Sequence, residues 1–237
     1  MRAQIIFLLI FLFPAAAWAQ CPVSQWTVYP LEDRMDNHSM VLIFGQGKNT
    51  EVLDEVMHHR GSFFLQSGFM QVVLLPVQYH QGARNLSEIL LKPEFFLQSG
   101  TTYELRFSGP SLEDSTALFR HWEVTPNDPH APEPVLEGNV SLDHNGTRMV
   151  CRMRGRGMQP LLAQIVLIDP RFKSLHKQYK KFLLPLQEGT IGLTGGECAA
   201  AFQVEASIRY TAIVSLTDLD GHSSLPVEGL QAREDHP

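Results

Sequence analysis

Basic residues are concentrated in one stretch of the chain, from Arg148 to Lys181. The stretch contains nine Lys and Arg residues and one acidic residue, Asp169, which gives a local net charge of +8. The whole chain carries −6, so the remaining residues sum to −14. Arginine binds carboxylates and phosphates through paired N–H donors. The stretch therefore indicates a docking site for an anionic envelope polymer, phospholipid headgroups or an acidic protein.

Side chains alternate between the two faces of a strand, so a strand through 149–156 places every second residue on one face. Three arginines then share a face and repel one another unless an anionic surface lies opposite. We expect the binding residues to be Arg152, Arg154, Arg156, Arg171, Lys173 and Lys177. The alternative is a solvated basic face, or one that pairs with the acidic first half of the chain.

Histidines suggest a second kind of chemistry near the N-terminal third. Asp54 and His58, and likewise Glu55 and His59, have the i, i+4 spacing that places two ligands on one helix face. Neighbouring histidines point about 100° apart on a helix, however, and no third ligand is obvious. A periplasmic metal-binding protein is therefore an alternative function, and we expect no bound metal or cofactor.

The segment Asp218 to Ser223 has the beginning of a calcium-binding loop. A complete loop needs a bidentate Glu at its twelfth position, which is occupied by Gly229. The segment therefore predicts a hairpin turn.

Catalytic motifs are missing from the sequence. It contains no Gly-x-Ser-x-Gly and no phosphate-binding glycine loop that opens a helix. We therefore expect a protein that is not an enzyme. The net negative charge also gives no support to nucleic-acid binding.

The N-terminus has the pattern of a secretory signal peptide over residues 1–19. An apolar run from Ile5 to Phe13 is followed by Ala17-Trp-Ala19, which fits cleavage before Gln20. The run is too short to span a membrane, and no later segment is apolar enough. We expect a periplasmic or secreted protein without a transmembrane segment. Cys21, next to the cleavage site, is free, bonded to another chain or lipidated.

An oxidising compartment permits one disulfide among the three cysteines. Cys151 and Cys198 fall in the same half of the chain, so we predict that they pair. The alternative is that all three cysteines are reduced.

The segment 125–134 contains four prolines and marks a domain boundary, because proline interrupts both helices and central strands. It separates residues 20–124 from 135–237, each about the size of a small domain. Both halves contain short, alternating apolar segments bounded by turns, which predicts an all-β fold of antiparallel sandwiches. Short helices are expected at 51–59 and at 171–184. Strands are expected at 38–44, 70–78, 101–107, 117–124, 135–142, 147–154, 162–168, 202–206, 210–217 and 225–230.

One hexapeptide occurs twice, as Phe-Phe-Leu-Gln-Ser-Gly at 63–68 and at 95–100. We interpret both copies as loops that lead into strands, with Phe as the anchor and Gly closing the turn. A duplicated binding loop is the alternative.

Two segments resemble immunoglobulin-like modules. Residues 90–105, which end in Gly-Thr-Thr-Tyr-Glu-Leu, resemble the end of bacterial Ig-like domains of the copper-resistance type, and 41–44 is compatible with their early core strand. Residues 210–224 resemble the last hairpin of fibronectin-type modules. The resemblance implies two tandem Ig-like β-sandwich domains. Copper binding is not implied, because the predicted mature start, Gln20-Cys-Pro22, has no histidine.

Together these patterns predict an exported, non-catalytic binding or structural module of the cell envelope. Four Asn-x-Ser/Thr triplets support a second alternative, a glycosylated cell-surface receptor or adhesion protein. These triplets begin at Asn37, Asn85, Asn139 and Asn145. No pattern in the sequence indicates an oligomeric state.

Overall fold

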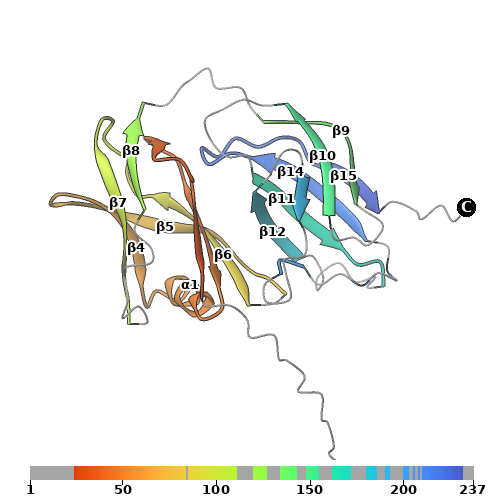
Figure 1. Cartoon of the computed structure of the whole chain (residues 1–237), viewed down its shortest axis with the longest axis horizontal. Coiled ribbons are helices and arrows are strands. Elements are labelled where there is room, and N and C mark those ends of the chain that lie inside the picture. Colours follow the sequence, from red (N-terminus) through yellow and green to blue (C-terminus); the bar gives the residue numbers. More distant parts are fainter. Residues whose placement is uncertain are drawn as a thin grey trace, which may run out of the picture.

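The described part of the chain is mostly β-strand with one short helix, and its strands form an eight-stranded and a seven-stranded sheet (Figure 1). The computed structural model describes residues 24–83, 85–110, 120–126, 134–142, 148–154, 162–171, 180–185, 190–192, 200–202, 205, 208 and 210–231. The predicted signal peptide and Cys21 lie outside these ranges. Within them, no helix has the length and apolar composition that a bilayer-spanning segment requires.

The first sheet has the strand order β1-β3-β6-β5-β4-β7-β8-β2. Its strands are β1 (Trp26–Tyr29), β2 (Arg34–Asp36), β3 (Val41–Gln46), β4 (Ser62–Ser67), β5 (Met70–Gln81), β6 (Leu86–Pro93), β7 (Thr102–Ser108) and β8 (His121–Thr125). Strands β1 and β2 lie at opposite ends of this order, although only four residues separate them in sequence. Four residues reach roughly 18 Å, whereas eight flat strands span about 34 Å. The sheet must therefore curl round on itself.

The curled sheet encloses a hydrophobic core. Alternate residues of β4, β5, β7 and β8 point into it, and helix α1 (Asn49–Met57) adds Val52, Leu53 and Val56. The helix predicted at 51–59 is thus confirmed with a small shift. Trp122 is fully buried and donates its indole N–H to the carbonyl of Pro30 at 3.1 Å, so the core holds β8 against the segment after β1.

The second sheet has the order β12-β11-β14-β15-β9-β10-β13. Its strands are β9 (Val135–Leu142), β10 (Arg148–Arg154), β11 (Leu162–Ile168), β12 (Lys180–Pro185), β13 (Thr190–Gly192), β14 (Thr211–Thr217) and β15 (Val227–Gln231). The prediction of antiparallel sheets holds except at two pairs, β2–β8 and β15–β9, which are parallel.

The helix predicted at 171–184 is wrong over its last five residues, which lie in strand β12. This strand pairs along β11, with Leu183 opposite Gln164, and buries Phe182. Backbone pairing and burial of the aromatic ring outweigh the local helical preference.

The two sheets share a hydrophobic cluster. The outer face of the first sheet contributes Leu42, Phe44, Leu86 and Leu90, which pack with residues of β11, β12 and β14. The Phe44 and Phe182 ring centroids are 6.2 Å apart. Strands up to β8 belong to the first sheet and strands from β9 onward to the second, and the proline-rich segment lies between β8 and β9. The division into two domains remains a prediction, and the shared cluster shows that the two sheets are not independent units.

The repeated hexapeptide adopts two different structures. The first copy forms strand β4 and buries Phe63, whereas the second connects β6 to β7 and leaves Phe95 and Phe96 exposed. Gly68 and Gly100 both have positive φ, as expected for glycines that close turns. The interpretation of the first copy as a loop is wrong, and so is Phe as the anchor of the second copy, because Leu97 is the buried residue there.

Candidate functional site

The predicted basic site lies mostly in parts of the chain whose side chains are not described. Arg152 and Arg154 belong to β10, two residues apart, just after a shift of register that follows Val150. Arg152 is paired in register with Glu137 of β9. Arg156, Lys173 and Lys177 lie outside the described residues, so the basic face remains a prediction.

Arg171 has partners within its own half of the chain. Its guanidinium donates to Asp169 Oδ2 at 2.6 Å and to Glu205 Oε1 at 3.0 Å. These carboxylates raise the pKa of Arg171, and the guanidinium lowers the pKa of Asp169. Arg171 therefore links Asp169, just after β11, to Glu205.

The predicted disulfide also remains a prediction. Cys151 lies where the register of β10 shifts against β9, and Cys198 is outside the described residues. Of the four Asn-x-Ser/Thr sites, Asn85 is exposed in the turn between β5 and β6 with a positive φ. Asn37 is half-buried, Asn139 lies in β9 and Asn145 falls outside the described ranges.

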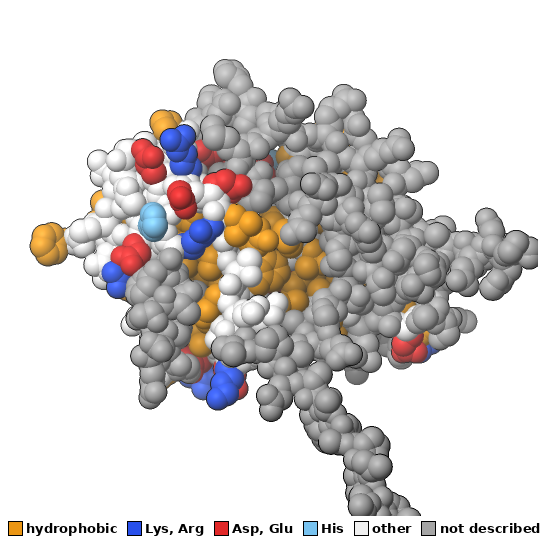
Figure 2. Space-filling model, viewed as in Figure 1, with side chains coloured by type: hydrophobic (Ala, Val, Ile, Leu, Met, Phe, Trp, Pro, Cys, Tyr) orange, Lys and Arg blue, Asp and Glu red, His pale blue; other side chains and the backbone are white. Residues whose placement is uncertain are grey.

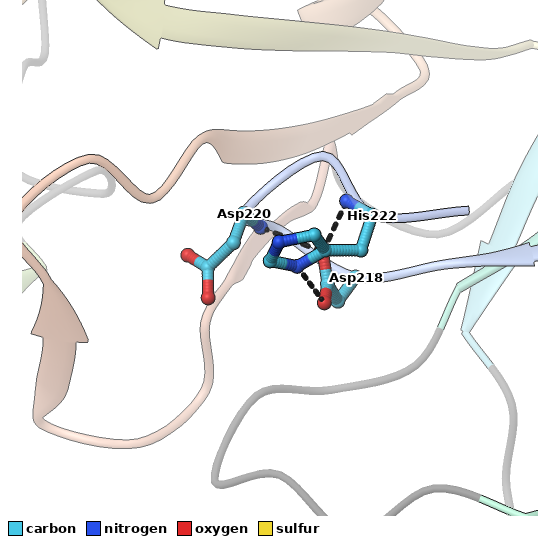
Figure 3. Close-up of side chains that lie close together, drawn as sticks. All are labelled: Asp218, Asp220 and His222. Carbon is cyan, nitrogen blue, oxygen red and sulfur yellow. Dashed lines mark hydrogen bonds and ion pairs between the residues drawn. The ribbon is translucent and has the colours of Figure 1, made fainter. Parts of the chain in front are cut away.

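The two histidines of the metal alternative lie at the C-terminal end of α1. His58 is largely exposed, its Nδ1 lying 3.5 Å from Asp54 Oδ2, and His59 has a positive φ. Within the described part of the chain, the three-residue group with metal-ligand spacing is a different one, Asp218, Asp220 and His222 (Figure 3).

The contacts of this group hold a turn. Asp218 Oδ1 accepts the amides of Asp220 at 3.0 Å and His222 at 2.8 Å, and Asp218 Oδ2 lies 2.9 Å from His222 Nδ1 (Figure 3). Gly221 supplies the positive φ. The predicted hairpin turn is confirmed, and it uses the oxygen atoms that a metal would need.

The same turn contacts the first sheet. Ser39 Oγ donates to Asp220 Oδ1 at 2.6 Å, and the amide of Met40 donates to the carbonyl of Leu219 at 2.7 Å. Burial, with the nearby Asp36 and Asp218 carboxylates, raises the pKa of Asp220 despite the Ser39 hydrogen bond. The turn therefore joins the two sheets.

A second polar contact joins the sheets through a buried carboxyl. Glu88 of β6 is 1% exposed, and its Oε1 accepts the amide of Leu183 of β12 at 2.6 Å. His80 Nδ1 lies 2.7 Å from the same oxygen, whereas Oε2 has no hydrogen-bond partner. Burial raises the pKa of Glu88 well above its usual value. Burial, reinforced by Lys181, lowers the pKa of His80 to about 4. Burial therefore favours the uncharged form of both side chains.

The most distinctive exposed surface is the hairpin formed by β4 and β5. Its 18 residues from Ser62 to Tyr79 include no Asp, Glu, Lys, Arg or His. The outward side chains of β5, Val73, Leu75 and Val77, are 39%, 47% and 49% exposed, and we call them the β5 strip. Phe69, at the turn, is fully exposed beside Met70. In Figure 1 this turn stands out from the body on the side away from the second sheet.

Charged residues border the β5 strip on both sides. Lys92 of β6 is in register with Leu75, and the amide of Glu94 donates to the carbonyl of Val73. On the other side, beyond strand β4, Glu104 and Arg106 of β7 form an ion pair at 2.6 Å. On the face shown in Figure 2, charged side chains of both signs lie to one side of a central group of hydrophobic side chains. An apolar centre with a polar rim is the usual anatomy of a protein interface.

The sequence patterns described above do not predict this surface. The signal was the absence of charge over 18 residues together with apolar residues at every second position of β5. The burial of Glu88 cannot be predicted from the sequence, because no local pattern distinguishes a buried glutamate from an exposed one.

Comparison with known proteins does not assign the chain to a family. No family model matches it, and no curated protein is significantly similar. Solved structures with similar arrangements include the N-terminal Ig1-2 module of the Drosophila receptor protein tyrosine phosphatase DLAR. It has 10% sequence identity and a TM-score of 0.27, over 88% of this chain and 100% of the module. The fibronectin(III)-like modules of Clostridium thermocellum CbhA have 11% identity and a TM-score of 0.26, over 90% and 98% of the two chains. A pullulanase from Bacillus subtilis has 10% identity and a TM-score of 0.27, with 27% of its chain covered.

Proposed function

We propose that the protein is an exported, non-catalytic binding module that contacts another protein through its β4–β5 hairpin. The observation that carries the proposal is the combination of a fully exposed Phe69 with the uncharged β5 strip. Aromatic and aliphatic side chains left in water are unfavourable by about 25 cal/mol per Å² of apolar surface. A contiguous apolar surface of this kind is typical of an interaction site.

A protein partner fits this surface better than a membrane does. Peripheral proteins that insert apolar side chains into lipid usually carry Lys or Arg beside them, which interact with anionic headgroups. The hairpin from Ser62 to Tyr79 has no basic residue, and the chain as a whole is acidic.

A site-specific photo-crosslinker tests the proposal in the native host. Replacing Phe69 by a benzophenone amino acid keeps an aromatic side chain at the turn, and Leu225, 84% exposed in the second half, provides a matched control position. We expect protein adducts from position 69 and far fewer from position 225. Equal labelling at the two positions, or none at 69, contradicts the proposal.

The basic stretch supports a second docking site, for an anionic polymer or acidic protein of the cell envelope. Its support is the local charge of +8 and the placement of Arg152 and Arg154 two residues apart in β10. This site and the hairpin lie on different sheets, so they can be tested by separate variants.

A further inference from the structure

The arrangement of the β5 strip and its charged neighbours indicates which kind of protein binds there. This inference rests on the function proposed above. We propose that the strip binds a second copy of this chain, so that the protein forms a two-fold symmetric dimer with the first sheets face to face. In such an interface each residue of one copy meets a residue of the other about a single axis.

The register of β5 and β6 supplies the axis. Leu74 is paired with Pro93, so Val73 and Leu75 flank one point and Lys92 and Glu94 flank the neighbouring point. Consider a two-fold axis that lies in the interface and crosses both strands at these points. It brings Val73 of one copy against Leu75 of the other.

The same axis brings Lys92 of each copy against Glu94 of the other. Both side chains are exposed and lie one on each side of Pro93. The Glu94 amide continues the pairing with β5 by donating to Val73, so strand alternation puts Glu94 on the same face as Lys92. One operation therefore matches apolar with apolar and positive with negative. The surface is therefore complementary to itself. This favours a second copy as the partner, because binding to an unrelated protein does not require a self-complementary surface.

The charge of the whole molecule favours the same face. Two acidic chains repel each other, and the repulsion is smallest where the facing surfaces carry no net charge. The strip and its rim residues, Lys92 and Glu94, meet this condition. The outer face of the first sheet is already an interface elsewhere, because its Leu86 and Leu90 pack on the second sheet. The strip continues that face.

Sedimentation velocity of the purified full chain over a range of concentrations tests the proposal. We expect a reversible dimer. Leu75→Lys would bury an unpaired charge against Val73 of the other copy and should weaken the dimer by about 100-fold or more. Leu225→Lys, a change of the same kind at an exposed position, should leave it unchanged. Near-UV circular dichroism and the melting temperature check that each variant is folded.

A charge exchange tests the position of the axis. Lys92→Glu and Glu94→Lys each place like charges together at two symmetric points, and each should weaken the dimer by about fivefold. The double variant exchanges the charges and should restore the wild-type dissociation constant. A dimer in which the double variant is as weak as the single ones, or in which Leu75→Lys has no effect, overturns the proposal.

A wild-type chain that remains monomeric also overturns it. If that monomer binds phosphatidylcholine vesicles through the strip, the occupant is lipid. If it is instead crosslinked at position 69 to a different protein in the host, the binding function stands and only the second copy is excluded. A monomer with no adduct at position 69 contradicts both proposals.

Discussion

The carboxyl of Glu88 in β6 and the backbone amide of Leu183 in β12 form a 2.6 Å hydrogen bond across the junction of the two sheets. Strand β12 is the last of the described strands in the order of the second sheet, so no described strand pairs with its outward amides. Glu88 satisfies one of them from the other sheet. An unpaired strand edge is a common starting point for aggregation, and this contact covers part of it.

Replacing Glu88 by Gln should change how stability depends on pH. The pKa of Glu88 is raised, so above pH 4.5, its usual pKa, the unfolded chain releases a proton that the folded chain keeps. Stability then falls with rising pH, by up to about 1.4 kcal/mol per pH unit, until the pH reaches the folded pKa. His80 acts oppositely between pH about 4 and 6.5, where the unfolded chain binds a proton that the folded chain does not.

Between pH 4.5 and pH 6.5 the two effects oppose each other, because the Glu88 effect lowers stability with rising pH and the His80 effect raises it. Glu88→Gln removes the Glu88 effect, so we expect the free energy of unfolding to rise more steeply with pH over this range in the variant than in the wild type. Urea unfolding from pH 4.5 to pH 6.5 measures it, with Glu228→Gln, at an exposed glutamate of β15, as control. The same pH dependence in Glu88→Gln and in the wild type would contradict this prediction.

Gly82→Ala should destabilise the junction between the sheets. A Cβ at this position would lie 2.5 Å from the carbonyl oxygen of Ala200 and 3.0 Å from that of Leu86, both backbone atoms. Relieving such contacts requires backbone movement, which costs about 1–3 kcal/mol. Chemical denaturation measures the loss. In Gly45→Ala the added Cβ would instead contact backbone atoms of α1. This variant should also be less stable, but a fluorescent label attached at the junction of the sheets should give the same signal in its folded state as in the folded wild type.

Trp122→Phe should reduce stability by about 2–3 kcal/mol. The change removes buried ring volume and leaves the Pro30 carbonyl without its indole donor. Thermal and urea unfolding provide the measurement. The control is Phe95→Leu, at a residue that is 67% exposed, and its stability should stay within about 0.5 kcal/mol of the wild type.

Binding of anionic polymers through the basic stretch should weaken as the salt concentration rises. Replacing Arg152, Arg154 and Arg156 by Ser should weaken adsorption to an anionic polymer such as heparin and flatten its dependence on ionic strength. The elution position on a heparin column at several salt concentrations measures this. Identical elution of the variant and the wild type would remove these arginines from the site.

The alternation of apolar and polar residues predicts several strands well. It fails where contacts between distant parts of the chain determine the local structure. Val135–Leu142 and Leu162–Ile168 match their predicted bounds. Strand β6 was missed because Leu86–Pro93 is buried on both faces, by the first core and by the second sheet, and so shows no alternation. The Phe-Phe-Leu-Gln-Ser-Gly copies show the same limit, since one sequence is a strand beside β5 and β7 and a loop elsewhere.

The candidate site could be foreseen only in part. The local excess of arginine is visible in the composition, and the absence of charge from Ser62 to Tyr79 could have been noticed. Which apolar residues of β5 remain in water depends on how far the second sheet extends over the first. That extent follows from contacts between residues about 95 positions apart, such as Glu88 and Leu183, which no local pattern encodes.

The shared cluster also has a consequence for biosynthesis. Leu42, Phe44, Leu86 and Leu90 leave the ribosome well before the β11, β12 and β14 residues that cover them. At usual rates of synthesis, of about 5–20 residues per second, the last of these residues follows β6 by roughly 6–25 s. During that interval the first sheet, if it has formed, exposes a large apolar face. Chaperones that hold nascent or translocating chains are therefore expected to bind this first half until the second is complete.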